Sequence, residues 1–467
     1  MFTQLHPYDV QYLTDPSQEE LRALTLEHTP AVYETRSGNL NKMSRNKARM
    51  AKHTYVISEP SDADSWSHQT MPRAEAEALI QGQRDYIRSR GRLIEIRGDL
   101  GLGPRAVGVQ WLYTIEGANI AGMQQVLSFP TAQANGTGFQ PSLRVVYTPD
   151  HRPDLPGGQA ILVDLENFTT YVMGPDYFGE SKKGALRMLN EMVYRQNGLV
   201  LHAGAKLVRF GDSEMTMTIM GLSGTGKTTT TFSKQGDVTQ PIQDDMVVLW
   251  PEGELSVTEN GCFAKTFGLT EESEPVIYRG TLSPEAWVEN VYLNADGSFD
   301  FFKGAINPED AARLRQSLVQ TGADPDKVDR FVSGQVTLDQ VTDDSGVLLD
   351  GWDFVKWTEN GRSIIPMSSV EDAADLHHIP PVRSMGILNR DEGRDAATPG
   401  ILKFVSPEQA AGYFMLGETT KTSAAGKEVG KTRSPFTQPF FPRAHGLQAE
   451  RFSEIAATMP QVSMWMM

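Results

Sequence analysis

The sequence contains one cysteine, Cys262, among its 467 residues, and this excludes a framework of disulfides within the chain. It also lacks an apolar run of the 18 or more residues that a membrane-spanning helix requires. Residues 1–10 lack the basic start and apolar centre of a secretory signal. A single cysteine is typical of a reducing compartment, and together with the other two absences it leads us to expect a cytoplasmic protein.

Basic residues are scarce relative to acidic ones. Lys and Arg number 43 against 59 Asp and Glu, so the formal net charge is −16. A field of this sign repels nucleic acid and anionic membranes, and we expect neither as a partner. Any phosphate must therefore be bound by a local cluster of cations. The length and the 39% hydrophobic content predict a globular protein of two or three domains, whereas the oligomeric state is left open.

Two groups of basic residues stand out locally. The stretch 36–52 includes Lys42 and, by charge pattern alone, predicts a solvated helix face or loop. The pair Lys182 and Lys183 would be interpreted in the same way. Residues 417–435 are mostly Gly, Thr, Lys, Ser and Glu, and they predict either a mobile lid or a plain exposed loop.

The strongest signal is a complete phosphate-binding loop. Its residues are Gly221, Leu222, Ser223, Gly224, Thr225, Gly226, Lys227 and Thr228. An apolar segment at 215–220 predicts a strand before the loop, and residues 228–233 predict the start of a helix after it, which is the context that the motif requires. The glycines allow backbone N–H groups to surround an anion, Lys227 adds charge to the β- and γ-phosphates, and the Thr228 hydroxyl can bind the nucleotide's Mg²⁺. The sequence therefore predicts binding of ATP with a divalent metal.

Acidic residues that could hold this metal follow the loop. Asp244 and Asp245 precede an apolar run, and we expect the run to form a strand beside the P-loop strand; the alternative is that the two acids form a simple turn. His202 lies in another strand-like segment, where a histidine is either a core residue or a ligand of Mn²⁺ or a similar metal, with Asp245 as its natural companion. The residues alone leave both alternatives open.

With these motifs in place, the sequence resembles the ATP-dependent phosphoenolpyruvate carboxykinases. The resemblance is strong over 175–300, fair to about 455 and faint before 175. It is carried, in chain order, by YFGESKKG at 177–184, His202, the loop text GLSGTGKTT at 221–229, Asp244 and Asp245, NGCFAKT at 260–266, EPVIY at 274–278, ENV at 289–291, TENGR at 358–362 and the 420–430 stretch.

The resemblance implies an α/β fold of two domains of the phosphoenolpyruvate carboxykinase type. We expect an N-terminal substrate-side α/β domain over 1–205 and a P-loop mononucleotide-binding domain over 206–467, with a lid near 417–435. It also implies the conversion of oxaloacetate and ATP to phosphoenolpyruvate, CO₂ and ADP, a lyase reaction of gluconeogenesis.

Roles for single residues follow from the same resemblance. Lys183, His202 and Asp245 would hold a catalytic Mn²⁺ or Mg²⁺, and Thr228 the nucleotide's Mg²⁺. Nucleotide binding extends to Thr229, Lys265 and Glu289. Substrate and phosphoryl chemistry would involve Arg36, Tyr177, Lys183, Lys227, Asp244 and Arg362. Arg36 is chosen over Arg45 as the N-terminal substrate arginine.

The sequence also departs from the family pattern. His202 is followed by Ala-Gly-Ala-Lys where the family has Cys-Ser-Ala-Asn, and Met246-Val247 follow the aspartates where the family has Glu-His. Family members continue for many tens of residues beyond this length, with a segment that holds adenine, so we expect a divergent, C-terminally short member. Three explanations are open. The chain is a truncated gene product, or it holds adenine in a different way, or its substrate is not the usual one. The alternatives are a P-loop kinase of this fold acting on another small molecule or a protein hydroxyl, and a catalytically weak nucleotide-binding protein.

Overall fold

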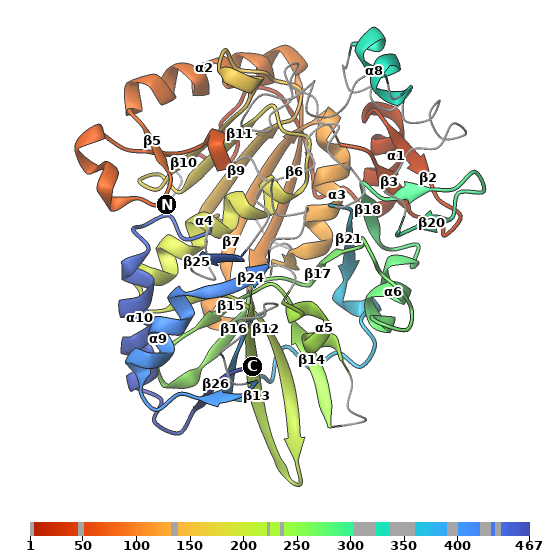
Figure 1. Ribbon diagram of the computed structural model, residues 1–467. Helices are drawn as coiled ribbons and strands as arrows, with labels where there is room; N and C mark the ends of the chain where they lie inside the picture. The colour runs from red at the N-terminus through yellow and green to blue at the C-terminus, as the bar shows by residue number, and fades with distance from the viewer. Residues whose placement is uncertain are drawn as a thin grey trace.

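The computed structural model describes residues 4–44, 51–131, 139–221, 225–233, 238–302, 315, 319, 324–333, 335, 360–389, 400–420, 431–434 and 440–467. Over these residues the chain is a mixed α/β structure with several sheets (Figure 1). Two large sheets and one smaller sheet carry the residues that matter for the candidate site.

The largest sheet has nine strands in the described residues, in the order β1-β6-β7-β9-β11-β10-β4-β5, and β8 pairs with β6 at its side. Its strands are β1 (Gln11–Thr14), β4 (Thr54–Ile57), β5 (Gln69–Met71), β6 (Arg92–Leu100), β7 (Val107–Thr114), β8 (Phe129–Pro130), β9 (Leu143–Thr148), β10 (Ala160–Asp164) and β11 (Thr169–Met173). All six residues of β9 and all five of β10 are buried, as expected for strands covered on both faces.

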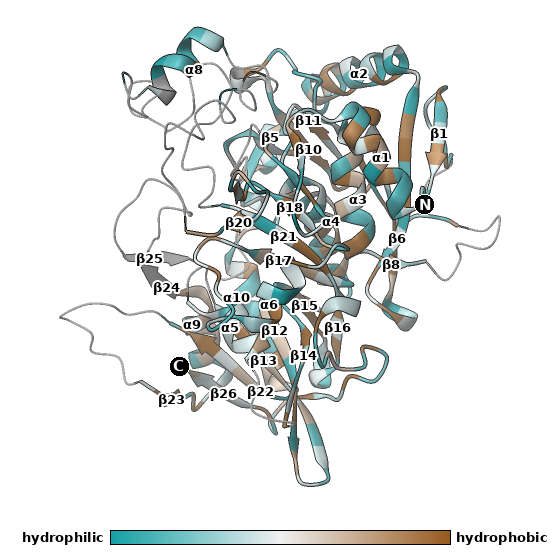
Figure 2. Cartoon of the chain, turned by 90° about the vertical axis from the view of Figure 1, so that its right-hand side faces the viewer, coloured by the Kyte–Doolittle hydropathy of each residue, from teal (hydrophilic) through white to brown (hydrophobic). Residues whose placement is uncertain are grey.

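The second sheet has the order β16-β15-β12-β13-β22-β26-β23, and β14 also pairs with β12. Its strands are β12 (Leu199–Phe210), β13 (Ser213–Gly221), β14 (Thr239–Gln243), β15 (Met246–Leu249), β16 (Leu255–Val257), β22 (Val382–Leu388), β23 (Leu402–Lys403) and β26 (Ser463–Met466). The antiparallel pair β12–β13 forms the long hairpin that extends at the bottom of Figure 1. Figure 2, which is turned by 90°, shows the same hairpin at the bottom of the molecule.

A smaller sheet joins distant parts of the chain in the order β17-β21-β18-β3-β2. Its strands are β2 (Val32–Glu34), β3 (Leu40–Lys42), β17 (Gly261–Lys265), β18 (Trp287–Glu289) and β21 (Arg362–Pro366). Two further pairs are formed by β19 (Tyr292–Leu293) with β20 (Phe299–Asp300), and by β24 (Gly417–Thr420) with β25 (Lys431–Ser434). The small sheet therefore places the N-terminal hairpin β2–β3 beside strands from the second half of the chain.

The helices lie around these sheets. They are α1 (Gln18–His28), α2 (Arg73–Arg90), α3 (Ala118–Leu127), α4 (Gly179–Arg195), α5 (Lys227–Phe232), α6 (Pro275–Thr281), α8 (Pro325–Val332), α9 (Pro407–Met415) and α10 (Gly446–Ala457). Helices α3 and α4 pack on the nine-stranded sheet, and α4 also contacts β12 of the second sheet. Helix α4 thus lies between the two large sheets. Among the described helices, none combines the length and apolar character needed to cross a bilayer.

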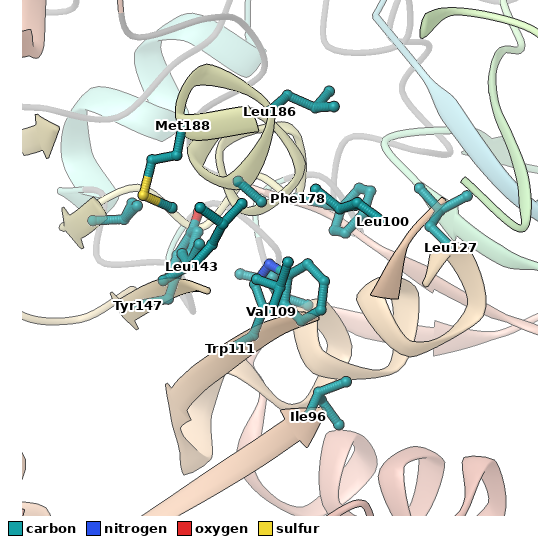
Figure 3. Close-up of a cluster of buried hydrophobic side chains, with 14 of the residues drawn as sticks. Ile96, Leu100, Val109, Trp111, Leu127, Leu143, Tyr147, Phe178, Leu186 and Met188 are labelled. Carbon is teal, nitrogen blue, oxygen red and sulfur yellow. The ribbon is translucent and has the colours of Figure 1, made fainter. Parts of the chain in front are cut away.

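The largest core is built between the nine-stranded sheet and the helices α3 and α4. Figure 3 shows Ile96, Val109, Trp111, Leu127 and Leu186 in it, on strands β6 and β7 and on both helices. A second core lies under α9 and α10, where the rings of Phe414 and Phe452 stack 4.7 Å apart. Because α4 is almost entirely buried between these layers, its polar residues must find partners inside the protein.

Several sequence predictions about the elements are confirmed. The strand predicted at 215–220 is β13, and the helix predicted after the loop is α5, which begins one residue earlier, at Lys227. The predicted strand neighbour is wrong: β15, which follows the two aspartates, pairs with β12 and β16, so β12 separates it from the P-loop strand. The domain boundary expected at 205 falls within β12, and the division into two domains stays a prediction.

Gly122 in α3 illustrates how tightly this core is packed, and it gives a testable prediction. A Cβ on Gly122 would lie 2.3 Å from Cζ2 of the buried Trp287. Alanine gains about 1 kcal/mol of helix propensity over glycine, whereas overpacking a core costs about 1–3 kcal/mol. We expect Gly122→Ala to lower the free energy of unfolding, measured from urea midpoints. The matched control is Gly412→Ala in α9, where no atom lies within 4 Å of the added Cβ and the stability should rise; equal gains in both variants would contradict the packing argument.

Candidate active site

The predicted phosphate-binding loop connects β13 to α5 in the sequence. Strand β13 ends at Gly221, and α5 begins at Lys227 with Gly226 as its N-cap at φ +93°, a conformation that glycine adopts without strain. Thr225 precedes this cap, while residues 222–224, which complete the motif, lie outside the described residues. The strand–loop–helix order predicted from the sequence is therefore found in the structure.

The two aspartates lie between β14 and β15, which both pair with β12. Gln243 pairs with Ala205 and Met246 pairs with His202. The two aspartates between them are not paired with β12, and they lie opposite residues 203–204 of that strand. Asp245 has φ +86°, a region that non-glycine residues rarely adopt and that costs about 1–3 kcal/mol. Such outliers cluster at functional sites because the surrounding structure must enforce them.

Asp244 binds the start of the P-loop helix. Its Oδ1 accepts a hydrogen bond from Nζ of Lys227 at 2.9 Å, and its Oδ2 accepts one from the Thr228 hydroxyl at 2.7 Å. Asp244 is only 5% exposed, so these charge-assisted contacts are made away from bulk water. The acid therefore fixes the two side chains that the motif assigns to the nucleotide phosphates and their metal.

Asp245 contacts side chains from three other elements, β12, α4 and α5. Its Oδ1 lies 2.9 Å from Nε2 of His202 and 3.6 Å from Nζ of Lys227. Its Oδ2 accepts a hydrogen bond at 2.5 Å from Lys182, whose ammonium also contacts Glu259 at 2.9 Å. We call this group the aspartate cluster: Lys182, His202, Lys227, Thr228, Asp244, Asp245 and Glu259.

Charge and burial set the protonation states in this cluster. Burial opposes ionisation of Asp245, but the ammonium groups of Lys182 and Lys227 outweigh it and hold the pKa of Asp245 well below its ordinary value. Burial and the negative charge of Asp245 raise the pKa of Glu259 to about 7, although the ammonium of Lys182 opposes this shift. The two carboxylates in turn raise the pKa of Lys182 despite its burial. Asp245 is therefore a firmly ionised acid at neutral pH.

A second group of charged residues lies side by side across the small sheet. Lys265 on β17 is paired with Arg362 on β21, Arg362 with Glu289 on β18, and Glu289 with Lys42 on β3. Directly paired residues project from the same face of a sheet, so four residues from distant segments form one line. We call Lys42, Lys265, Glu289 and Arg362 the charged row.

Phe263 lies between the two groups. Its ring centroid is 5.1 Å from Nζ of Lys182 in the aspartate cluster and 5.2 Å from Cζ of Arg362 in the charged row, both within cation–π range. Arg362 also donates from Nε to the hydroxyl of Tyr177 at 3.4 Å, and the carbonyl of Tyr177 accepts a hydrogen bond from Tyr147 at 2.9 Å. The nucleotide-side and substrate-side candidates are thus neighbours around one aromatic ring.

Lys183 lies one residue beyond Lys182 on α4 and is also buried. Its Nζ is 3.5 Å from Glu180 and 5.7 Å from the ring centroid of Tyr177. The described residues hold no group of three His, Cys, Asp or Glu side chains able to bind a metal ion. The imidazole of His202 and the carboxylate of Asp245 nevertheless suit Mn²⁺, and a third protein ligand would have to be of another type, such as the amine of Lys183.

Other predicted residues lie elsewhere. Arg36 occupies the turn between β2 and β3, where its side chain is 71% exposed and pairs with Asp296 at 3.0 Å. The hydroxyl of Thr229 donates to Glu274. The roles predicted for Arg36 and Thr229, like those of the other site residues, stay predictions.

Some residues of the site were missed or misinterpreted. The interpretation of the basic stretch as solvated is wrong for Lys42, whose side chain is 3% exposed and lies 3.5 Å from Asp176. The solvated interpretation of Lys182 and Lys183 is wrong as well, since both are buried. Glu259 was not predicted, although it stands directly before the recognised NGCFAKT text. The one sequence signal for Lys42 was the presence of Leu40 and Met43 close to it in a short segment able to form a strand.

Comparison with known proteins agrees with the resemblance. The family described as phosphoenolpyruvate carboxykinase matches residues 10–323, more than half of the chain. Proteins named phosphoenolpyruvate carboxykinase (ATP) are similar to it. The protein of Aeropyrum pernix is 28% identical over 60% of this chain and 47% of its own length. The protein of Thermus thermophilus is 26% identical over 68% of this chain and 50% of its own length.

The protein of the same name from Geobacillus thermodenitrificans matches over a longer stretch. It is 25% identical over 90% of this chain and 69% of its own length. The chain thus spans about half the length of the first two relatives and more of the third.

Glu289 generates a prediction on pH and stability. Burial raises the pKa of Glu289 from 4.5 to about 8, and Oε2 of its carboxyl is buried without a hydrogen-bond partner in the described residues. The folded state therefore favours the neutral acid, so this stability contribution is complete below pH 4.5 and is lost as the pH rises towards 8. We expect Glu289→Gln to gain stability relative to the unsubstituted protein across this window, by up to about 1.4 kcal/mol per pH unit. Urea unfolding at pH 5, 6, 7 and 8 measures it, and a difference that does not change with pH would contradict it.

Proposed function

We propose, because the chain belongs to the phosphoenolpyruvate carboxykinase family, that it converts oxaloacetate and ATP to phosphoenolpyruvate, CO₂ and ADP. The match over residues 10–323 establishes the family, and the mixed α/β structure with several sheets fits a fold of that type. We further propose that the sheet containing β13 is the core of a C-terminal nucleotide-binding domain.

The observation that carries this proposal is the pair of adjacent aspartates. Asp244 contacts Lys227 and Thr228 of the phosphate loop, while Asp245 contacts His202 and Lys182. Phosphate-binding groups and candidate metal ligands are thereby held at neighbouring residues. Phosphoryl transfer depends mainly on such positioning and on compensation of charge, so the cluster suits a γ-phosphoryl group.

The proposed reaction has two steps. In the first, the bond between the carboxylate carbon and its neighbour in oxaloacetate breaks, CO₂ leaves, and the electron pair forms an enolate. In the second, the enolate oxygen attacks the γ-phosphorus of ATP, and the bond to the β-phosphate oxygen breaks to release ADP. Both steps develop negative charge that cations next to the reacting oxygens would stabilise.

Residues of this chain can be assigned to these needs. Arg362 would bind the substrate or the γ-phosphoryl group, Tyr177 would face the carboxylate that leaves as CO₂, and Lys265 would assist the phosphates. Lys183, His202 and Asp245 would hold a Mn²⁺ or Mg²⁺ ion, and Thr228 the Mg²⁺ of the nucleotide. Such an ion supplies Lewis-acid stabilisation of enolate and phosphoryl oxygens.

Water must be excluded from the enolate, which it would protonate. We propose that the ribbon of β24 and β25, over Gly417–Thr420 and Lys431–Ser434, supplies the arms of a lid over the site. This follows the resemblance in the 417–435 region, of which residues 421–430 lie outside the described part of the chain. Exclusion of water by such a lid would favour phosphoryl transfer over hydrolysis.

One observation favours a second candidate, a P-loop kinase of the same fold acting on another acceptor. Arg36, chosen for the substrate carboxylate, is exposed and pairs with Asp296. A site with an intact aspartate cluster but without this carboxylate contact would accept a different phosphoryl acceptor. The product assay below separates the two functions.

The first test follows phosphoenolpyruvate formation from oxaloacetate and ATP with Mg²⁺ and Mn²⁺. We expect activity in the unsubstituted protein and a loss of about 10²–10³-fold in kcat/KM for Lys227→Met and for His202→Ala, because each removes a group that stabilises developing charge. Lys403→Met, at an exposed lysine of β23, is the matched control and should keep full activity. ATP binding without phosphoenolpyruvate would refute the carboxykinase reaction, and phosphorylation of another acceptor would then support the kinase.

A second test concerns the substrate arginine. Since Arg36 is exposed and engaged by Asp296, we expect Arg36→Ala to change KM for oxaloacetate by less than about threefold. Arg45→Ala, at the other candidate for the N-terminal substrate arginine, is measured beside it, and a rise in KM for oxaloacetate of about tenfold or more would identify the arginine that binds the substrate carboxylate. Steady-state kinetics with both variants decide between the two residues, and the reverse pattern would establish Arg36.

A further inference from the structure

Lys206 is a buried lysine of β12 that the proposed reaction does not use. It is 5% exposed, and its ammonium donates to the carbonyl oxygens of Thr230 at 2.8 Å and Ser233 at 2.9 Å. It also contacts the hydroxyl of Ser233 at 3.4 Å. These carbonyls are at the end of α5, the helix that begins at the P-loop lysine. A buried ammonium is therefore bound to the distal end of the phosphate-binding helix.

The last carbonyls of a helix have no partner within the helix and must be satisfied from outside. In a long helix, the way in which these carbonyls are satisfied affects only the terminal turn. Helix α5 has six residues and, at 1.5 Å per residue, is only about 9 Å long. In so short a helix, a change of direction at Ser233 also displaces Lys227 at the other end. The contact of Lys206 is thus in a position to set the orientation of the whole helix.

A second contact from the same strand reinforces this arrangement. Gly204 faces Thr231 of α5, and a Cβ on Gly204 would lie only 1.9 Å from the Thr231 hydroxyl oxygen. That hydroxyl donates to the carbonyl of Lys227 at 2.9 Å. The backbone of β12 therefore approaches the middle of α5 as closely as glycine permits, while Lys206 is bound to its end.

The spacing of these residues links the helix to the aspartate cluster. His202, Gly204 and Lys206 are alternate residues of one strand, and alternate residues face the same side. His202 contacts Asp245, Gly204 contacts Thr231, and Lys206 contacts the end of α5. One face of β12 thus carries a candidate metal ligand and both supports of the P-loop helix.

We propose that Lys206 is a positioning residue that holds the P-loop helix in register with His202 and the two aspartates, so that tight binding of nucleotide phosphates depends on it. This inference rests on the proposed function for the identity of the nucleotide. It adds a residue that does not touch the ligand and acts through α5. Its effect falls on the phosphates, because Lys227 and Thr228 begin that helix.

The test compares Lys206→Met, which removes the donor and keeps the aliphatic stem, with Lys206→Arg, which restores a cationic donor. Affinity for a fluorescent ATP analogue with Mg²⁺ is measured by titration, without turnover. We expect Lys206→Met to weaken binding about tenfold or more, and Lys206→Arg to recover most of the loss. In steady-state assays KM for ATP should rise while KM for oxaloacetate stays within about twofold, since Arg362 and Tyr177 are on other elements.

A control separates positioning from general destabilisation. Phe452→Leu removes packing between α9 and α10, and Phe452 is not a contact of α5. The melting temperatures of Phe452→Leu and Lys206→Met are measured, and their nucleotide affinities are compared relative to the stability that each variant loses. If Phe452→Leu weakens nucleotide binding as much as Lys206→Met does, or if Lys206→Met binds like the unsubstituted protein, the inference is overturned. Should Lys206→Met not fold, Lys206→Gln, a shorter neutral donor, is measured by the same criteria. Since binding is read without turnover, a protein that binds nucleotide but forms no phosphoenolpyruvate refutes the proposed reaction while the Lys206 comparison still decides this inference.

Discussion

The pairing of two adjacent, poorly hydrated carboxylates with buried lysines is the constraint around which the candidate site is built. Two unit charges about 4 Å apart interact by about 4 kcal/mol at the effective dielectric of a protein surface, and by more when water is excluded. Ammonium groups from α4 and α5 face these acids: Lys182 and Lys227 contact Asp245, and Lys227 contacts Asp244. This requirement ties β12, α4, α5 and the β14–β15 connection to one point.

Such an arrangement lowers the stability of the folded state. Buried ion pairs rarely add stability compared with apolar packing, because both partners lose their hydration. Asp245 adds backbone strain through its positive φ. An apolar turn between β14 and β15 would satisfy the same connection without either cost. These costs are what the proposed binding of a charged ligand would explain, and Lys182 contacts both Asp245 and Glu259.

The part of the site that depends on local signals could be predicted from the sequence. Glycines at fixed spacing, an apolar strand before them and a helix after them predicted the loop, and the strand and the helix are found as β13 and α5. The neighbour of β15 was mispredicted, because strand order depends on pairing between segments far apart in the chain. The charged row could not be predicted from the sequence for the same reason. Lys42 and Arg362 become near neighbours only through the register of β3, β18 and β21. Charge alone made Lys42 resemble a surface residue, whereas Asp176 and the sheet bury it.

The two groups of charged residues differ in how their acids are held, and this difference matters for an anionic substrate. In the aspartate cluster Lys182 and Lys227 outweigh burial and keep the pKa of Asp245 low, so this acid carries a negative charge at neutral pH. In the charged row burial raises the pKa of Glu289 to about 8, so at neutral pH the acid is mostly neutral. A neutral Glu289 leaves the charge of Arg362 largely uncompensated on that side of Phe263. The two groups thus place a firmly ionised acid on one side of Phe263 and the guanidinium of Arg362 beside a mostly neutral acid on the other.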